Sequence, residues 1–421
     1  MLTYFVFIFF LSIVIYGFVR KKWMAGIFIV MVYALSAFAS IFLLQADTTF
    51  KAPTIIPTIL YCGLLFVTLK PFIRNRPVIE GFRTASEQKR FVLVGYALSL
   101  VVILGMIIIL PKITNALDYG LVDSRTAMYR GEGEDSSHDS ILMKIGSQLV
   151  GYFGAVWYLY IIMFFYAVAF IHGKSLLKIL LMVASLSQVE VGLTVGGRTN
   201  AIYWLLSFLF TLILFYPYLT RKTRKIAISS FLVFFVVVLV YVVFITIQRS
   251  IFREGGTQLF LLQYVGEPYL YFCYFIEKLD WHSYSFERIF PFGSYLLGTG
   301  FNLQDYRYLV EQHTGMEIGI FYTFMGDIYV DLGLLGLLVF VFIYNRIAST
   351  ILRPKVFYLK NLFYLGVLYT VPLHGLFYYS LWKNGDFCVI FVLVLARYVS
   401  GVMRTNKSTS TTKEVIKNEK I

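Results

Sequence analysis

The chain has 421 residues, of which 59% are hydrophobic and only 14% are charged, and its mean hydropathy is +0.74. A water-soluble domain carries about 25% charged residues, because it has to cover its core with a solvated shell. This composition excludes such a shell and indicates a protein whose solvent is itself apolar.

Apolar runs of about 17–25 residues, long enough to cross a bilayer as helices, recur along the sequence. In lipid every backbone polar group needs an internal partner, and a helix supplies one for each. We therefore predict an all-α, polytopic integral membrane protein with a single transmembrane helical domain over residues 1–403 and a disordered cytoplasmic tail over 404–421. The predicted spans, about eleven in number, cover residues 2–19, 23–45, 53–70, 91–110, 148–171, 176–196, 199–218, 226–247, 321–345, 357–380 and 387–403.

The basic residues predict the orientation of these spans. If the N-terminus lies outside, the inner loops and the tail collect 25 of the 37 Lys and Arg residues but only four of the 23 Asp and Glu residues. Cytoplasmic loops of membrane proteins carry such an excess of Lys and Arg. We predict an outer N-terminus and a cytoplasmic C-terminus. The net charge of +14 follows from this orientation and gives no reason to expect nucleic acid as a partner.

The three cysteines, Cys62, Cys273 and Cys388, are scattered and show no Cys-x-x-Cys or Cys/His spacing. We expect neither a disulfide framework nor a metal site.

Two predicted outer loops, about 111–147 and about 248–320, are long and polar. Loops of more than about 12–15 residues tend to be functional or disordered. Within the second loop, Gln258–Tyr264 and Tyr269–Lys278 are rich in aromatic residues. We predict that both form amphipathic helices in the plane of the membrane interface. The loop should then cover the outer mouth of the bundle.

The first candidate site is the turn Val195-Gly196-Gly197-Arg198-Thr199-Asn200 between two spans. Glycines permit a tight bend, and the guanidinium fork of an arginine pairs with phosphate through two hydrogen bonds. The alternative is a snorkelling arginine that caps the turn. Glu190 lies in the same hairpin, where an unpaired charge is unfavourable, so we interpret it as a structural partner of Arg198 or of another buried cation.

The second candidate pair is Arg249 and Arg253. Their spacing of four residues places both on one face if the eighth span continues as a helix. Two guanidinium groups at the water boundary form a cradle for an anion, and binding of a lipid headgroup is the alternative.

The third candidate lies at the outer half of the ninth span. Asp327 and Asp331 are again four residues apart, and they are expected either to hold the arginines or to orient an acceptor hydroxyl. Gly333-x-x-Gly336 is interpreted as a close-packing face between helices. The sequence shows no evident broken helix of the kind found in many transporters.

Further polar and aromatic residues near the outer face are candidates for binding or chemistry. A lone histidine is more often structural, and a tyrosine there can stack on sugar rings or simply anchor the interface. These residues are Glu267, His282, Arg288, His313, His374, Tyr264, Tyr269, Tyr271, Tyr274 and Trp281.

These features together resemble the bacterial oligosaccharide repeat-unit polymerases (Wzy-type) of O-antigen and capsule synthesis. The resemblance rests on the number of spans, the large late outer loop, and residues 195–204, 248–256 and 318–336. It implies a GT-C-like helix bundle with two large outer loops in the bacterial cytoplasmic membrane. It also implies a glycosyltransferase without metal or cofactor, which transfers a growing glycan from undecaprenyl diphosphate to a new lipid-linked unit. A flippase and a chain-length regulator are its implied partners.

Under this resemblance, Arg198, Arg249 and Arg253 stabilise the departing diphosphate. The general base is Glu267, His313 or Asp327, which the sequence does not rank. The residues expected to bind substrate are Arg288, Tyr264, Tyr269, Tyr322 and Asp331.

Two other functions stay open at this point. The related O-antigen ligases usually carry a histidine eleven residues before the first glycine of Gly333-x-x-Gly336, where this chain has Tyr322, so the departure argues against a ligase-type transferase. A flippase or another transporter would use the same arginines to hold the lipid diphosphate in transit.

Overall fold

The structure is a computed structural model, and it is almost entirely helical in the part of the chain that it describes. That part comprises residues 1–47, 50–74, 77–118, 140–194, 196–250, 256–284, 289–290, 298, 308–309, 311–313, 315, 322–379 and 385–401, with the backbone alone for 115–118, 248–250, 256–261 and 385–386. The predicted tail 404–421 and most of the predicted loop after residue 284 lie outside the described residues.

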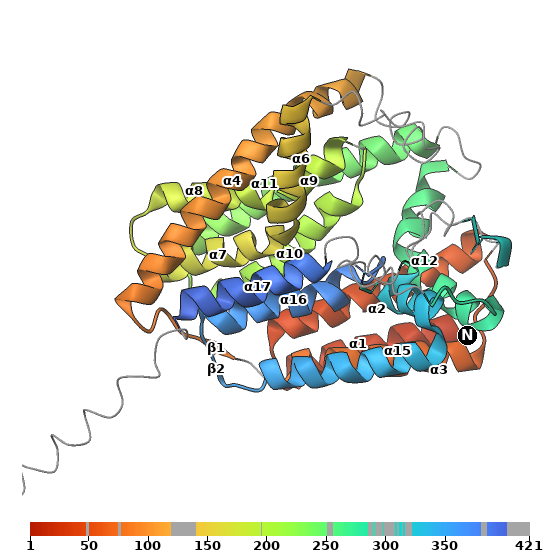
Figure 1. Cartoon of the computed structure of the whole chain (residues 1–421). Coiled ribbons are helices and arrows are strands. Elements are labelled where there is room, and N and C mark those ends of the chain that lie inside the picture. Colours follow the sequence, from red (N-terminus) through yellow and green to blue (C-terminus); the bar gives the residue numbers. More distant parts are fainter. Residues whose placement is uncertain are drawn as a thin grey trace, which may run out of the picture.

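The elements follow one another in a simple order along the chain (Figure 1). The first half contains α1 (Leu2–Val19), α2 (Met24–Ala46), α3 (Ile55–Arg74), β1 (Val78–Ile79), α4 (Ala85–Asp118), α6 (Ile141–Phe153), the 3-10 helix η1 (Gly154–Val156), α7 (Trp157–Phe170), α8 (Ser175–Ser185) and α9 (Ser187–Thr194). The second half contains α10 (Thr199–Phe215), the 3-10 helix η2 (Tyr216–Tyr218), α11 (Arg221–Ser250), α12 (Gly256–Lys278), α15 (Thr323–Ile351), β2 (Val356–Phe357), α16 (Leu359–His374) and α17 (Gly385–Ser400).

Nine helical segments within the described residues are long and apolar enough to cross a membrane. They coincide with nine of the eleven predicted spans, which supports an all-α polytopic membrane protein. The remaining two predicted spans are occupied by α16 and α17, which are shorter at 16 residues each. The nine segments are Leu2–Val19, Met24–Ala46, Ile55–Arg74, Ala85–Thr114, Ile141–Phe170, Ser175–Thr194, Thr199–Tyr218, Arg221–Ile247 and Thr323–Ile351.

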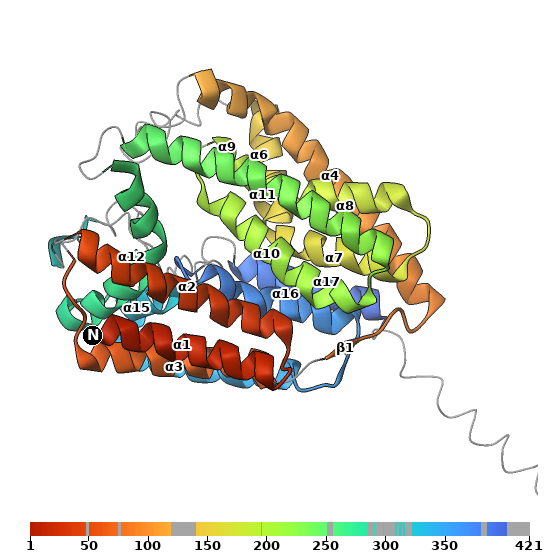
Figure 2. The same ribbon diagram turned by 180° about the vertical axis from the view of Figure 1, so that it is seen from behind.

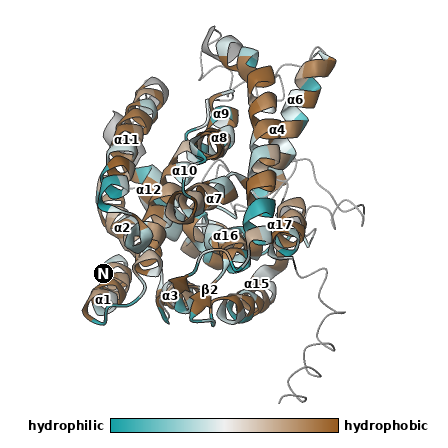
Figure 3. Ribbon diagram, turned by 90° about the vertical axis from the view of Figure 1, so that its left-hand side faces the viewer, coloured by the Kyte–Doolittle hydropathy of each residue, from teal (hydrophilic) through white to brown (hydrophobic). Residues whose placement is uncertain are grey.

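The helices form two groups, with α16 and α17 between them (Figures 1 and 2). One group contains α1, α2, α3 and α15, and the other contains α4 and α6–α11. We name the end of the bundle that carries β1 and β2 the basic end, and the opposite end, where α15 begins, the far end. Figure 3 looks along the bundle from the basic end and shows the hydrophobic colour over most of the helical ribbon.

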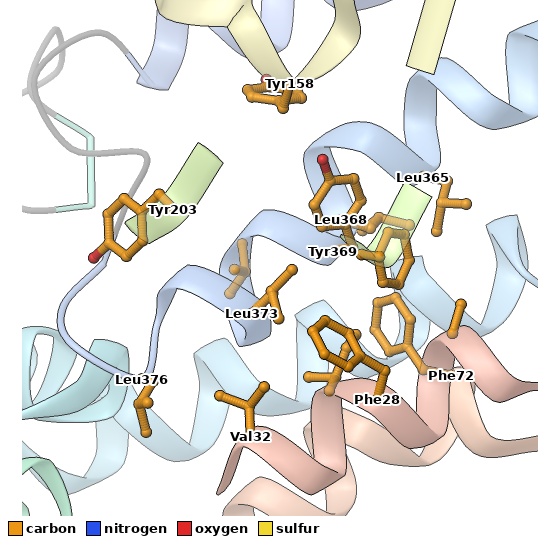
Figure 4. Packing of buried hydrophobic residues seen from close by; sticks show 14 of the residues in the cluster. Phe28, Val32, Phe72, Tyr158, Tyr203, Leu365, Leu368, Tyr369, Leu373 and Leu376 are labelled. Carbon is orange, nitrogen blue, oxygen red and sulfur yellow. The ribbon is translucent and has the colours of Figure 1, made fainter. Parts of the chain in front are cut away.

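The core is centred on α16, which contacts α2, α7, α10, α15 and α17. Tyr369 of α16 stacks on Phe210 of α10, with the ring centroids 4.3 Å apart. On the opposite side, the hydroxyl of Tyr33 in α2 donates to the carbonyl of Pro372 at 2.7 Å. Figure 4 shows side chains of α2, α3, α7 and α10 meeting around α16. A helix that is apolar all round is a buried helix, and α16 therefore joins the two groups.

Two short parallel strands close the basic end, although the sequence predicted no strand. The amide of Val78 donates to the carbonyl of Lys355 at 2.8 Å, and the amide of Glu80 donates to the carbonyl of Phe357 at 3.0 Å. Backbone groups of a connection need partners where they leave water. The pairing ties the connection after α3 to the connection after α15.

One helix is longer than the span predicted within it. The span was predicted at residues 91–110, and α4 covers 34 residues, Ala85–Asp118, and continues through Pro111. A helix of this length rises about 51 Å, which exceeds the roughly 30 Å hydrocarbon core. The helix therefore extends beyond the apolar run at both ends, and the predicted loop from residue 111 is shorter than expected.

The prediction of two separate helices after residue 257 is wrong, and their placement in the membrane interface stays a prediction. The structure has one helix, α12, which passes through Pro268 and packs on α2. A proline removes a backbone donor and bends a helix. Beside this bend, the hydroxyls of Ser36 and Ser40 donate to the carbonyls of Val265 and Gly266 at 2.6 and 2.7 Å. These hydrogen bonds tie α12 to α2 just before the proline.

We predict that Gly266→Ala destabilises the protein. A Cβ at this position would lie 3.0–3.1 Å from backbone atoms of Ala39 and Ser40, and backbone cannot easily give way. Overpacking of this kind costs about 1–3 kcal/mol. Thermal unfolding in detergent should show a lower midpoint for this variant.

The matched control is Gly63→Ala in α3, where nothing lies within 4 Å of the added Cβ. Both substitutions gain the same helix propensity, so their difference reports packing alone. Equal midpoints for the two variants would contradict the close approach of α12 to α2.

Candidate functional site

The turn between α9 and α10 is built by a glycine with a positive φ. Gly196 has φ of 58°, and its amide donates to the carbonyl of Leu193 at 3.2 Å. The next amide, that of Gly197, donates to the carbonyl of Gly192 at 2.7 Å. This pair of bonds is a Schellman motif, which ends a helix with glycine in the left-handed conformation. The chain reverses within a few residues and places Arg198 immediately before α10.

Arg198 joins three helices at the far end of the bundle. Its side chain is only 5% exposed, and Nη1 donates to the Thr246 hydroxyl of α11. Its guanidinium carbon lies 4.8 Å from the centre of the Tyr264 ring of α12. The Tyr264 hydroxyl in turn shares a 2.8 Å hydrogen bond with Thr199. A buried cation needs such partners, and here they fix the guanidinium in position.

Aromatic packing connects this arginine to the start of α15. The ring centroids of Tyr264 and Phe377 lie 5.2 Å apart. Phe377 belongs to the turn that follows α16. The carbonyl of Phe377 accepts a hydrogen bond from the amide of Thr323 at 3.0 Å. The segment 375–379 therefore lies between the arginine and the first turn of α15.

Both predicted acids of α15 are fully buried. Asp327 accepts a hydrogen bond from the backbone amide of Tyr379 through Oδ2, and it lies within electrostatic range of the Tyr203 hydroxyl. Asp331 accepts a hydrogen bond from the Ser283 hydroxyl at 2.7 Å. These bonds give both carboxylates a positioning role, because each holds a segment that has no helix of its own.

α15 is a broken helix, contrary to the sequence prediction. Gly333 has φ of 67° and ψ of −173°, which interrupts the helix ten residues after its start. A break leaves carbonyl groups of the preceding turn without helical donors. Here the amides of Ser283 and Tyr284 donate to the carbonyls of Val330 and Asp331 at 3.1 and 2.8 Å. The segment 279–284 thus completes the hydrogen bonding of the break.

The glycine pair of α15 is not a helix–helix packing face, and that interpretation is wrong. A Cβ on Gly333 would lie 3.1 Å from the ring of His282, and one on Gly336 would collide with Leu332 of its own helix. The first glycine therefore serves the break and the close approach of the histidine. The spacing of the two glycines alone did not distinguish a break in the helix from a face that packs on another helix.

His282 sits at the break, outside the membrane-spanning segments. Its ring meets that of Tyr329 edge-on, with the centroids 4.9 Å apart. Burial lowers the pKa of this histidine below 6.5, although nearby backbone groups of Tyr329 and Val330 act in the opposite direction. The neutral imidazole is therefore the favoured form at this position.

The other predicted residues are placed unevenly. Arg253 and Arg288 lie outside the described residues, and for Arg249 the structure describes only the backbone of α11. Glu267 is half-buried one turn after Tyr264 on α12, so it lies on the side of α12 that faces Arg198. The side chain of His313 is 38% exposed, and its Nδ1 lies 3.9 Å from Oδ1 of Asp280.

Two predicted substrate-binding tyrosines belong to the core. Tyr269 is fully buried and shares a 3.1 Å hydrogen bond with Thr58. Tyr322 is 4% exposed, and its ring lies 4.8 Å from that of Phe275. In this conformation both support the position of α12 rather than present a surface to ligand.

Glu190 is not the partner of Arg198, and that prediction is wrong. Both of its carboxyl oxygens are buried without a hydrogen bond, and no ion pair with a described residue is found. Glu190 lies one turn after Ser187, which donates to the carbonyl of Gly154 at 3.2 Å. Arg198 turns instead towards α11 and α12.

Sequence reasoning missed several residues that hold this site together. No sequence motif marks these residues, which lie in ordinary apolar or aromatic stretches: Thr246, Tyr203, Ser283 and Tyr379.

His374 is held by its neighbours. Its ring stacks between those of Tyr203 and Trp157, with the ring centroids 4.4 and 5.4 Å away. Its Nε2 shares a 2.7 Å hydrogen bond with Ser207. This histidine is therefore structural, as most lone histidines are.

Comparison with protein-family models, with characterised proteins and with solved structures finds no match for this chain. Among the described residues, no group of three His, Cys, Asp or Glu side chains is placed to hold a metal ion. The chemistry of the site therefore has to be argued from its own side chains.

We predict that His282 makes the protein sensitive to acid. Because burial lowers its pKa in the folded state, its contribution to stability is fully present above about pH 6.5 and is lost as the pH falls through the lowered value. Between pH 7.5 and pH 5.5, the thermal midpoint of the His282→Gln variant should therefore fall less than that of the wild type.

His172→Gln is the matched control, because His172 is exposed in the connection before α8. It should keep the acid sensitivity of the wild type. If the thermal midpoints of the wild type and of His282→Gln fall by the same amount over this pH range, protonation of His282 does not cause the acid sensitivity.

Proposed function

We propose that this protein is a membrane glycosyltransferase that polymerises lipid-linked oligosaccharide repeat units. In this proposal the growing glycan leaves its undecaprenyl diphosphate carrier and is joined to a new lipid-linked unit at the outer face of the bacterial cytoplasmic membrane. The proposal includes the GT-C-like architecture and the outer N-terminus that the sequence predicts. It rests on the resemblance of three sequence stretches and on the environment of Arg198.

The observation that carries the proposal is the immobilised guanidinium of Arg198. Thr246 holds one of its N–H groups and Tyr264 packs on its face. A fixed cation at the place where a diphosphate departs stabilises the developing charge without reorganisation. Preorganisation of this kind is difficult to explain by a snorkelling arginine, which reaches into water on a flexible stem.

The reaction itself is a substitution at the anomeric carbon of the growing glycan. The bond from this carbon to the diphosphate oxygen breaks, and a bond to a hydroxyl oxygen of the new unit forms. The diphosphate keeps the bonding electron pair, and the hydroxyl proton passes to a general base. Both substrates are anchored in one leaflet, so their proximity lowers the entropic cost of the encounter.

Among the three candidate bases, Glu267 fits this proposal best. It lies on α12 one turn after Tyr264, the residue that packs on the Arg198 guanidinium. Asp327 is fully buried and bound to the Tyr379 amide, and His313 packs on Trp281 with the ring centroids 5.3 Å apart. A base has to reach the acceptor hydroxyl directly or through one water, which favours the glutamate that follows Tyr264 on α12.

We predict that Arg198→Ala abolishes long glycan while the protein still inserts in the membrane. Loss of one preorganised donor typically slows a reaction by about 10²–10³. Single repeat units on the lipid carrier should then accumulate, as measured by gel analysis of glycan and by extraction of the carrier. Arg198→Lys, which keeps the charge but loses the fork, should restore a fraction of the chain-length ladder.

The matched control is Arg224→Ala at the basic end. Arg224 also packs over a tyrosine, with its guanidinium carbon 4.5 Å from the Tyr216 ring, and it donates to the Tyr216 carbonyl at 2.9 Å. This control should leave the ladder unchanged. A normal ladder from Arg198→Ala would refute the assigned role.

A second candidate function is transport of the lipid-linked unit. The broken helix at Gly333 favours it, because many transporters use interrupted helices near their substrate. The two functions differ in where single units collect when the protein is inactivated. A failed polymerase leaves them on the outer face, accessible to an added glycosidase, whereas a failed flippase leaves them protected on the inner face.

A further inference from the structure

A cleft at the basic end combines apolar walls with three cations. It has a volume of about 550 Å³ and lies between α1 and α3. Ile13 of α1 and Phe66 of α3 form part of its walls, and the cations are Lys22, Lys70 and Arg74. Among the described residues, no acidic side chain lines it. This cleft is remote from Arg198, which lies at the far end.

The three cations lie towards the basic end of the cleft, together with Ile73, and apolar side chains continue deeper along the helix axis beside Ser12. Arg74 lies in the last turn of α3, Lys70 lies one turn before it, and Phe66 lies one turn deeper. At a rise of 1.5 Å per residue, Phe66 lies about 12 Å from the level of Arg74. The cleft is therefore cationic at its mouth and apolar towards the middle of the bundle. A phospholipid has the same order of groups, with phosphate at the surface and acyl chain beneath.

The charge of the cleft selects among possible lipids. The dipole of α3 favours the two cations on its last turns. Lys22 lies in the connection between α1 and α2, where this dipole does not account for its presence. Each Lys or Arg near an anionic membrane surface adds to the attraction. Three cations without an acid therefore prefer a headgroup with net negative charge over a zwitterionic one.

The same combination recurs in a second cleft, of about 340 Å³, between α16 and α17. Lys360 and Arg397 supply its cations, while Tyr364 and Leu393 supply apolar surface. Two separate clefts at one end of the bundle thus share the same chemical character. We interpret this recurrence as support for a binding role of the first cleft.

We propose that the cleft between α1 and α3 binds an anionic phospholipid. Lys22, Lys70 and Arg74 hold the headgroup phosphate, and an acyl chain lies along Ile13 and Phe66. Under the predicted topology this end faces the cytoplasm, where anionic lipid is enriched in the leaflet. The site does not depend on the proposed glycosyltransferase activity.

Native mass spectrometry of the delipidated full chain tests this site. The probes are dioleoyl phosphatidylglycerol and dioleoyl phosphatidylcholine, which share their acyl chains and differ in net charge. The wild type should retain the phosphatidylglycerol. The triple variant Lys22→Gln, Lys70→Gln, Arg74→Gln should bind it at least roughly tenfold more weakly, with residual binding from the cleft between α16 and α17.

The matched control removes the same charges from the same end of the bundle. Arg221→Gln, Lys222→Gln, Lys225→Gln changes two lysines and one arginine that are exposed at the start of α11. Its affinity for phosphatidylglycerol should stay within about twofold of the wild type. An equal loss in both triple variants would mean general surface attraction and would overturn the site.

A steric variant separates the cleft from its charges. Ile13→Trp fills the apolar part while all three cations remain, and it should weaken retention of phosphatidylglycerol. Ile8→Trp changes the same residue type on α1 at a position that is 60% exposed and outside the cleft, and it should have no effect. Unchanged binding by Ile13→Trp would overturn the proposal, as would equal retention of phosphatidylcholine or full displacement by inorganic phosphate.

Discussion

The arrangement of the far end depends on one requirement, that backbone polar groups buried in a bundle have partners within the protein. α15 breaks at Gly333, and the amides of Ser283 and Tyr284 supply the donors that the helix loses. α12 bends at Pro268, and hydroxyls of α2 serve its carbonyls. The break in α15 is therefore compensated by the segment 279–284, and α12 is tied to α2 beside its proline.

The surroundings of Arg198 follow from this arrangement. α12 carries Tyr264 to the guanidinium, and the turn after α16 packs Phe377 against the same tyrosine. Asp327 holds that turn through the amide of Tyr379. Asp327 of α15 thus acts on the arginine site through this backbone segment. An immobile cation backed by several helices is suited to stabilise a negative charge that appears during a reaction, and this is the physical basis of the proposed activity.

The sequence predicted most of the helices because a long apolar run has few alternatives in a membrane. It also identified the turn at Gly196 and Gly197, since only glycine accepts the left-handed conformation that ends α9 without strain. It was wrong about the pairing of Glu190, the two helices around Pro268 and the role of Gly333. Those errors share a cause: each depends on which residue from a distant segment lies nearby, and no local pattern records this.

By itself, the sequence determined the class of the protein, most of its spans and the basic character of one end, because apolar length and charge are properties of each segment alone. Only the tertiary structure decided which polar groups share a site. Thr246 meets Arg198, and His282 meets Gly333, through packing of helices that are far apart in the chain. The physical reason is that a buried polar group is stabilised by whichever partner the fold brings within hydrogen-bond distance, irrespective of its sequence position.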